Sequence, residues 1–389
     1  MIKFHCKNCD QEISVQNESA GKRGKCPKCG NVVAVPSKST ERPNSKGAAR
    51  SDARPLLDQD PAGVLEGLPQ KVEQLHSEVS KVVFGQAAAV DGILYALLSR
   101  GHCLLVGVPG LAKTLLVRCM ARVMELKFSR IQFTPDLMPG DITGTEILQV
   151  DPSSNQRKFV FARGPVFTQM LLADEINRTP PKTQAALLEA MQEETVTVGE
   201  KTHPLEAPFV VLATQNPIEQ EGTYPLPEAQ LDRFMLELII DYPSHEDEHR
   251  VVAEHSFTPL DKLQPVLSRD EILQFREAVA QVPAAPNVVD YAVQLVRASR
   301  PGDELAPDYI EECVHWGASP RAAQHLILAG RARAACQGRF NVAREDVAAV
   351  ALPVLRHRLI RTFRAEAKGK TTDDIISELL GDMPSEVER

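Results

Sequence analysis

The segment at residues 107–114, Gly-Val-Pro-Gly-Leu-Ala-Lys-Thr, constrains the fold of this chain more than any other. It follows a short apolar run at residues 102–106, which has the composition of a buried strand. It precedes residues 115–124, whose apolar positions recur with helical period. A strand, a glycine-bearing loop that ends in Lys-Thr, and a helix form the context in which such a loop holds phosphate. The alternative is a loop that only joins the strand to the helix, and this context argues against it.

The loop indicates a nucleotide site because its backbone N–H groups and the first-turn amides of the helix point at one anion. Lys113 can reach the β- and γ-phosphates, and the Thr114 hydroxyl can coordinate Mg²⁺. The pattern has glycine before the lysine, where this chain has Ala112; alanine begins a helix well, so we expect a small effect. The predicted nucleotide-binding residues are Gly85, Gln86, Gly107, Val108, Pro109, Gly110, Leu111, Ala112, Lys113, Thr114, Leu115 and Asp174.

Apolar strands alternate with helices along residues 61–242. We expect helices at residues 64–83, then a second one that ends at Leu98, and another at 182–194. Further strands are expected at residues 128–133, 169–175, 209–214 and 235–240. This order predicts an α/β fold with a parallel sheet covered on both faces. Ligands of such sheets bind at the carboxyl ends of the strands, where Gly107, Asp174, Glu175 and Asn216 all fall.

The polar residues at these strand ends have separate expected roles. Adjacent strand residues point to opposite faces, so Asp174 and Glu175 should leave the strand in different directions. Asp174 is placed to hold Mg²⁺, directly or through water, and Glu175 can polarise a water aligned on the γ-phosphate. Asn216 can hydrogen-bond that water and the phosphate. Without the phosphate loop, the acidic pair would be a turn that closes a strand, and Asn216 before Pro217 a turn residue.

Two cysteine pairs near the N-terminus predict a metal site. Cys6 and Cys9 form one CxxC pair, and Cys26 and Cys29 form another sixteen residues later. Four thiolates complete a tetrahedral Zn²⁺ site with no open position. A unit of residues 1–36 is too small to fold on its core alone, so the metal would supply folding free energy. The alternatives are a redox dithiol pair and a motif that has lost its metal. Residues 37–60 have the composition of a flexible linker.

Composition and charge limit the class of protein. The chain has 389 residues, 43% of them hydrophobic, with a formal net charge of −8, which argues against a protein that coats nucleic acid as a whole. Residues 1–50 are the basic exception, with ten Lys and Arg against four Asp and Glu. No run approaches the roughly 20 apolar residues of a membrane-spanning helix, and no signal peptide is recognisable, so we expect a cytoplasmic protein.

Over residues 60–365 the chain resembles the MoxR family of AAA+ ATPases. The segments that carry the resemblance are residues 107–114, 133–144, 173–178, 180–184, 213–217, 226–234 and 317–321. The resemblance implies a ring, usually hexameric, with ATP at the subunit interfaces. It also implies an α/β nucleotide-binding domain at residues 61–242, a helical lid domain at 243–365 and a C-terminal tail at 366–389. The segment at residues 141–167 resembles the family's helix-2 insert, a hairpin that can face the central pore or a substrate.

The same resemblance assigns roles to single residues. Asp174 and Glu175 match the Walker B pair, and Asn216 matches sensor 1. Arg233 matches the arginine finger that reaches a neighbouring subunit's γ-phosphate. Arg321 matches sensor 2, and whether it acts on its own nucleotide or a neighbour's stays open. With Lys113, these residues are the expected catalytic set, and the expected cofactors are ATP, Mg²⁺ and Zn²⁺.

Three functional hypotheses follow. The first is an ATP-driven, chaperone-like machine that remodels, matures or inserts metal into a protein client, often with a von Willebrand factor A-type partner, as the family suggests. The second is a nucleic-acid-directed motor or loader recruited through the basic zinc ribbon. The third is a nucleotide-gated scaffold with slow hydrolysis. Residues 141–167 carry three basic and three acidic side chains and no basic stripe, which favours the first and makes nucleic acid an unlikely partner. The ribbon itself could dock proteins, contact nucleic acid or serve only structure.

Overall fold

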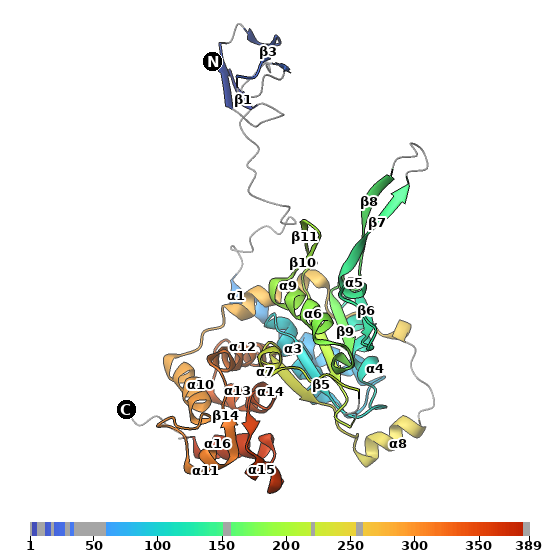
Figure 1. The fold of residues 1–389 in the computed structure, drawn as a ribbon. Helices are drawn as coiled ribbons and strands as arrows, with labels where there is room; N and C mark the ends of the chain where they lie inside the picture. Colours follow the sequence, from blue (N-terminus) through green and yellow to red (C-terminus); the bar gives the residue numbers. More distant parts are fainter. Residues whose placement is uncertain are drawn as a thin grey trace. The chain divides into compact units, whose positions relative to one another are not determined.

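The structure is a computed structural model that describes residues 2–5, 12–16, 19–27, 32–34, 60–150, 157–218, 222–253 and 260–383. The chain divides into two compact units, Met1–Asp58 and Gln59–Arg389 (Figure 1). No helix in the described ranges has the length and apolar content needed to cross a membrane.

The N-terminal unit contains two short antiparallel hairpins. Strand β1 (Ile2–His5) pairs with β2 (Glu12–Val15), and β3 (Arg23–Lys25) pairs with β4 (Val32–Ala34). Each CxxC pair therefore falls in the connection between the two strands of one hairpin. Cys26 is buried, whereas Cys6, Cys9 and Cys29 lie outside the described residues, as does most of the expected linker. Within the described ranges, no group of three or more His, Cys, Asp or Glu residues could hold a metal ion.

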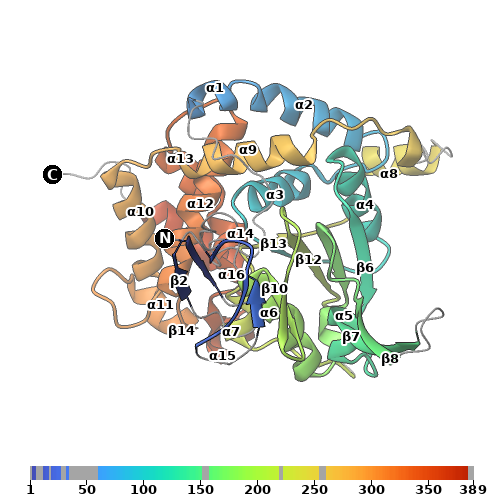
Figure 2. The same cartoon turned by 90° about the horizontal axis from the view of Figure 1, so that it is seen from above.

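The second unit is built around a five-stranded parallel sheet in the order β13-β5-β12-β9-β6 (Figure 2). Its strands are β5 (Cys103–Val106), β6 (Phe128–Gln132), β9 (Met170–Asp174), β12 (Val210–Gln215) and β13 (Leu236–Ile239). The predicted parallel α/β sheet is confirmed, and each expected strand lies within about a residue of its predicted range.

Both faces of this sheet are covered because the central strands are apolar at every position except near their carboxyl ends. Successive residues alternate between two hydrophobic clusters: Cys103 and Leu105 belong to one, and Leu104 belongs to the other. The same alternation separates Leu172 from Leu171. A sheet without a polar face must be sandwiched between layers of helices.

One face is covered by α2 (Leu68–Val79), α3 (Ala87–Leu98), α4 (Lys113–Val123) and α9 (Arg269–Ala280), and the other chiefly by α6 (Pro181–Glu193) (Figure 2). The predicted helix at residues 64–83 is in fact two, α1 (Pro61–Leu65) and α2. Gly67 and Pro69 account for the break, since glycine disfavours helix and proline cannot donate a helical hydrogen bond.

The expected hairpin is confirmed. Strands β7 (Gly144–Val150) and β8 (Arg157–Arg163) pair in antiparallel register, directly after the short helix α5 (Pro139–Thr143). Gly144 has a φ of +92°, and a Cβ there would lie 2.2 Å from the Ala162 carbonyl oxygen, so only glycine fits this base. A second hairpin, β10 (Thr195–Val198) with β11 (Lys201–Pro204), was not predicted.

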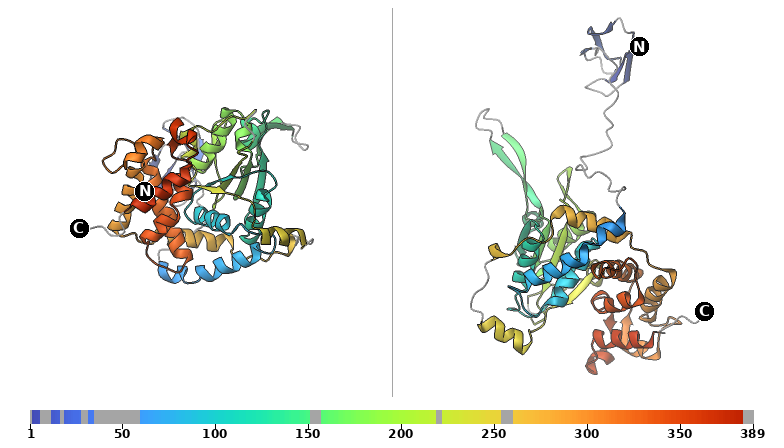
Figure 3. Two further views of the ribbon diagram at one scale, coloured as in Figure 1. Left: turned by 90° about the horizontal axis from the view of Figure 1, so that it is seen from below. Right: turned by 180° about the vertical axis from the view of Figure 1, so that it is seen from behind.

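A helical part follows the sheet and gathers on one side of it (Figure 3). It consists of α10 (Pro286–Ala298), α11 (Asp308–Cys313), α12 (Pro320–Cys336), α13 (Arg344–Ala349), α14 (Ala351–Leu355), α15 (Phe363–Ala367) and α16 (Thr372–Asp382), with a small ribbon of β14 (Val314–Trp316) and β15 (Ile360–Arg361). Helices α13 and α14 are separated at Val350, because Pro353 has no N–H to donate to the Ala349 carbonyl.

Two predicted boundaries of this helical part meet elements that cross them. Helix α9, expected in the lid, packs against α1 and α3 and also against α12 of the helical part, whereas α8 (His245–Ala253) has no buried residue. Residues 366–389, expected as a tail, include α16, which buries Ile375, Ile376 and Leu379 in the core. The Thr371 side chain caps this helix, so it has both a start signal and an apolar face.

Candidate active site

A cavity of about 370 Å³ lies at the carboxyl ends of β5, β9 and β12. Parallel strands place their carboxyl ends at one edge of a sheet, so loops that are distant in sequence meet there. The residues that line the cavity are Pro109, Gly110, Leu111, Ala112, Lys113, Thr114, Leu115, Asp174, Glu175, Thr214, Gln215 and Asn216. The structure thus brings together most of the residues that the sequence predicted for a nucleotide site.

The backbone of the phosphate loop is constrained at three positions. At Gly107 another strand end lies too close for a side chain, and at Gly110 and Ala112 the backbone is left-handed. A Cβ on Gly107 would lie 2.4 Å from the Ile240 carbonyl oxygen, because the ends of β5 and β13 run side by side here. Gly110 has a φ of +90°, and Ala112 has a φ of +55°. Ala112 therefore precedes α4 in the left-handed region rather than as a helical residue, contrary to our expectation, and this conformation costs an alanine about 1–2 kcal/mol.

Lys113, the first residue of α4, turns its side chain back onto this loop. Its ammonium donates to the carbonyl oxygens of Gly107 and Val108, the latter at 3.0 Å. Burial lowers the pKa of Lys113, and the negative charges of Asp174 and Glu175 oppose that shift. A cation held between a loop of amides and two carboxylates is well placed for a polyphosphate chain.

Asp174, the last residue of β9, is 8% exposed and has both carboxylate oxygens engaged. Its Oδ1 accepts a hydrogen bond from the Thr214 hydroxyl at 2.6 Å. Its Oδ2 accepts from Arg130 Nε at 3.0 Å and Nη2 at 2.7 Å. Asp174 and the Thr114 hydroxyl line the same cavity and are hard oxygen donors of the kind that Mg²⁺ prefers, so these residues fit that ion.

Glu175 leaves the strand in a left-handed conformation, with φ +59° and ψ +51°, before the 3₁₀ turn η2 (Ile176–Arg178). The different directions of Asp174 and Glu175 therefore come from this turn and not from strand alternation, which corrects our expectation. The Glu175 carboxylate accepts from Gln132 Nε2 at 2.6 Å and pairs with Arg178 Nε at 3.1 Å. Its backbone N–H donates to the Thr214 hydroxyl at 2.8 Å, so one hydroxyl connects the two acidic residues.

Asn216, which follows β12, is 6% exposed and lines the cavity. Its Oδ1 accepts from the Ile218 N–H at 3.2 Å. Its Nδ2 is buried and has no hydrogen-bond partner in the described part of the chain. A buried donor without a partner costs about 1–3 kcal/mol, and an anionic ligand oxygen in the cavity would satisfy it.

A second, smaller cavity of about 150 Å³ shares Gly110, Leu111, Ala112 and Leu115 with the first. Its other lining residues are mostly apolar: Lys81, Val82, Val83, Phe84, Gln86, Pro243 and Val251. Next to it, the Arg250 guanidinium lies 4.4 Å from the centre of the Phe84 ring. A flat aromatic base fits an apolar cavity beside a phosphate loop. Gly85 and Gln86 were both predicted to bind nucleotide. Gln86 lines this cavity, and the Gln86 side chain donates to the Asp241 carbonyl at 2.9 Å. Gly85 does not line the cavity.

Arg233 and Arg321 are not in the lining of either cavity. Arg233 follows α7 (Glu228–Leu231) and donates to the Leu188 carbonyl at 3.2 Å. Arg321, in the first turn of α12, pairs with the Asp232 carboxylate at 3.1 Å. The structure therefore separates the two expected catalytic arginines from Lys113, Glu175 and Asn216 of the same chain.

Sequence analysis missed Arg130, Gln132, Thr214 and Arg178. Arg130 and Gln132 lie two apart on β6, next to β9, so both reach the acidic pair from one face of the sheet edge. Two polar residues at this spacing on one strand were a usable signal, but only once the neighbouring strand was known.

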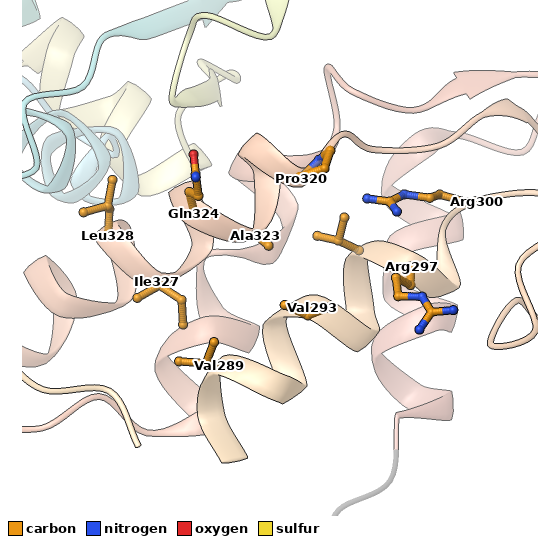
Figure 4. A pocket seen from close by; sticks show the side chains of 10 residues that line it. Val289, Val293, Arg297, Arg300, Pro320, Ala323, Gln324, Ile327 and Leu328 are labelled. Carbon is orange, nitrogen blue, oxygen red and sulfur yellow. The ribbon is translucent and has the colours of Figure 1, made fainter. Parts of the chain in front are cut away.

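A third cavity, of about 590 Å³, lies in the helical part between α10 and α12 (Figure 4). Val289 and Val293 face Ala323 and Ile327 across it, with Arg297 and Arg300 at one end. This cavity is larger than the other two, but the residues that line it include no arrangement of acid, base or nucleophile. We therefore place the chemistry of the molecule at the strand ends.

Comparison with known proteins defines the class. Residues 102–236 match the family described as ATPase family associated with various cellular activities (AAA), and residues 308–379 match the AAA lid domain. A crystal structure of an ATPase from Cytophaga hutchinsonii superposes with a TM-score of 0.75 at 42% identity, over 83% of this chain and 97% of that one. The protein is an AAA+ ATPase, a class that acts on ATP with Mg²⁺.

Full-length relatives narrow the class to a family. Chaperone MoxR1 of Mycobacterium tuberculosis is 45% identical over 323 residues, which cover 82% of this chain and 84% of the relative. Protein MoxR of Paracoccus denitrificans is 32% identical over 295 residues, or 72% and 85% of the two chains. The chain belongs to the MoxR family of AAA+ ATPases, as its motifs predicted.

Proposed function

We propose that this MoxR-family ATPase forms a ring of six copies and uses ATP hydrolysis to remodel, mature or insert metal into a protein client. The observation that carries the hydrolytic part is the Thr214 hydroxyl, which joins Asp174 and Glu175 at the edge of the phosphate-loop cavity. The chaperone-like part is supported by the name of the Mycobacterium relative.

In this proposal the phosphates bind along residues 107–114, with Lys113 on the β- and γ-phosphates and Asn216 Nδ2 donating to the γ-phosphate or the attacking water. Thr114 and Asp174 would hold Mg²⁺, which when bound would supply positive charge against the phosphates. Glu175 polarises the water, while Gln132 and Arg178 fix its carboxylate. The base occupies the apolar cavity beside Phe84 and Gln86. Phosphoryl transfer depends on positioning and electrostatics, which these contacts supply.

Arg233 serves a neighbouring copy in this arrangement. The support is its position outside the cavities of its own chain, at the α6 carbonyl of Leu188. An arginine supplied across an interface stabilises transition-state charge and raises turnover by about 10³–10⁵. Arg321 lies beside the same turn through Asp232, so we assign it to the same interface.

The β7–β8 hairpin is the proposed client contact. Ile147, Leu148 and Phe159 are large apolar side chains that are each about half exposed or more, on a hairpin that ends away from the core. Exposed apolar residues grouped in this way favour contact with another protein.

The two N-terminal hairpins are the proposed zinc ribbon and docking module. The support is that each CxxC pair falls between the paired strands of one hairpin, so four thiolates could close on one Zn²⁺. A von Willebrand factor A-type protein is the proposed partner class. A second candidate function is a nucleic-acid-directed motor recruited through this ribbon. The observation that favours it is the basic charge of residues 1–50.

An ATPase assay separates these functions. The full chain is assayed alone, with single- or double-stranded nucleic acid, and with an unfolded protein substrate, each over a salt titration. Stimulation by protein at moderate salt supports the proposal. Stimulation only by nucleic acid, with a steep salt dependence, would replace it with the motor hypothesis. A pull-down with Glu175→Gln, which should hold its client, then identifies the partner.

A further inference from the structure

Three consecutive residues of the helical part, Arg356, His357 and Arg358, contact the backbone at the start of β13. Arg356 Nη1 donates to the Glu237 carbonyl at 3.2 Å, and His357 Nε2 contacts the Phe234 carbonyl at 3.0 Å. The guanidinium of Arg358 reaches three carbonyls: Asp232 at 3.1 Å, Phe234 at 2.6 Å and Met235 at 3.3 Å. The segment so contacted, residues 232–237, contains Arg233.

Arg358 is the most enclosed of these side chains, with 2% of its side chain exposed. Besides the three carbonyls, its Nε donates to Asp232 Oδ1 at 2.8 Å and its Nη2 contacts His325 Nδ1 at 2.8 Å. Burial, with the positive charge of Arg358, lowers the pKa of His325 to about 3, so the neutral ring can accept that hydrogen bond. The guanidinium also donates to the Val354 carbonyl of its own helical segment. A buried guanidinium that donates both to this turn and to the helical part connects the two, and so fixes the position of the turn.

Asp232 connects the same turn to Arg321. Its carboxylate accepts from Arg358, from Arg321 Nη1 at 3.1 Å and from the Ser319 hydroxyl at 3.2 Å. Ser319 and Arg321 begin α12, and Arg358 follows α14. Two separate places in the helical part therefore hold the residue that directly precedes Arg233.

We propose that Arg358 and Asp232 are positioning residues, which transmit the placement of the helical part to Arg233 and so govern whether Arg233 reaches the nucleotide of a neighbouring copy. The inference rests on the proposed interface role of Arg233. Neither residue touches the nucleotide cavity of its own chain, so their loss should spare nucleotide binding and reduce what the subunit supplies to its neighbour.

The test uses Arg358→Lys in the full chain, which keeps the charge but lacks the planar fork of five donors. Alone, this variant should bind ATP within about threefold of wild type and hydrolyse it at least about tenfold more slowly. Equimolar mixing with Lys113→Ala subunits, which keep Arg233 but bind ATP poorly, should raise turnover severalfold. Arg361→Lys is the matched control, because Arg361 also donates to a carbonyl of the helical part, that of Lys370 at 3.0 Å, and should stay within about twofold of wild type.

The outcomes separate two failures. If Arg233→Ala is rescued by Lys113→Ala but Arg358→Lys is not, or if Arg358→Lys hydrolyses ATP like wild type, the positioning role is wrong and the interface role of Arg233 stands. If Arg233→Ala itself is not rescued, the interface role fails and this inference fails with it. If Arg358→Lys does not fold, Asp232→Asn tests the positioning role in its place. This variant keeps the contacts of Arg358 with the backbone carbonyls, and it should show a smaller loss of turnover with the same rescue by Lys113→Ala.

Discussion

The Thr214 hydroxyl donates to Asp174 Oδ1 at 2.6 Å, and both residues are almost fully buried at the ends of adjacent strands. The same hydroxyl accepts the N–H of Glu175. This one side chain therefore connects the Asp174 carboxylate to the backbone of Glu175, the two residues on which Mg²⁺ binding and water activation depend in the proposed mechanism.

Thr214→Val should reduce turnover by about tenfold or more, because valine has the shape of threonine but cannot bond to either acidic residue. It should also lower the free energy of unfolding by about 1–3 kcal/mol, since it leaves polar groups of Asp174 and Glu175 without a partner. ATP affinity should change little. Steady-state kinetics and urea denaturation check this. Thr197→Val, at an exposed hydroxyl pair with Thr202 on the β10–β11 hairpin, is the control and should change neither. Unchanged turnover in Thr214→Val would remove Thr214 from the site.

Arg233→Ala should bind ATP almost normally and hydrolyse it poorly, because in the proposed ring the arginine acts on a neighbouring copy's nucleotide. Equimolar mixing with Lys113→Ala should restore part of the activity, since some interfaces then pair an intact nucleotide site with an intact arginine. Turnover measured across mixing ratios checks this. A flat response at every ratio would mean that Arg233 serves its own subunit or only packs against α6.

Acid should destabilise the second unit through buried histidines. Burial lowers the pKa of His102 to about 4 and of His325 to about 3, and it lowers that of His357 well below its usual range. In the unfolded chain these groups take up protons near pH 6.5, so the unfolded state binds more protons between about pH 6.5 and 4. Stability is therefore full above pH 6.5 and falls as the pH drops through this window, by up to about 1.4 kcal/mol per pH unit for each group.

Urea denaturation at pH 7.5 and 5.5 measures this loss. His102→Gln should reduce the difference between the two pH values, because it removes one of the buried groups. The exposed His249→Gln is the control and should leave the difference unchanged. Equal stability of the wild-type chain at both pH values would show that these histidines are not held neutral by burial.

The full chain should carry one Zn²⁺ per subunit, and Cys26→Ser should lose it. Residues 1–36 should then become sensitive to limited proteolysis, since the metal supplies their folding free energy. Basal ATP hydrolysis should survive, because the chain divides into separate units at residue 58, whereas stimulation by a partner should fall. Metal analysis by atomic emission, with proteolysis and ATPase assays, checks each part. A collapse of basal hydrolysis with loss of the metal would contradict the docking role.

The sequence predicted those features that depend on local pattern. Buried parallel strands are continuous apolar runs, and a loop such as residues 107–114 carries its own glycines and lysine, so the sheet and the cavity at its edge were foreseeable. The register of Asp174, Glu175 and Asn216 at strand ends followed from the same runs. These features need no knowledge of which strands are neighbours.

What the sequence did not predict depends on tertiary contacts. Arg130 and Gln132 became site residues only because β6 lies next to β9. The left-handed conformation of Ala112 is imposed by the loop that precedes it, against the preference of alanine. Helix α9 has the same amphipathic pattern as a lid helix, and only its tertiary contacts show that it packs against α1 and α3 as well as against α12 of the helical part. Helix α16 was overlooked because the resemblance ended before it.

The measurement that tests the central claim most directly is ATP binding and single-turnover hydrolysis by Glu175→Gln. The amide keeps the shape of the carboxylate and can still contact Gln132, but it cannot polarise water as a base. We predict ATP affinity within about threefold of wild type, with hydrolysis lower by about 10²–10⁴ and ATP retained on the protein. Hydrolysis within a few-fold of wild type would contradict the assignment of Glu175, and with it the proposed chemistry of the cavity at the strand ends.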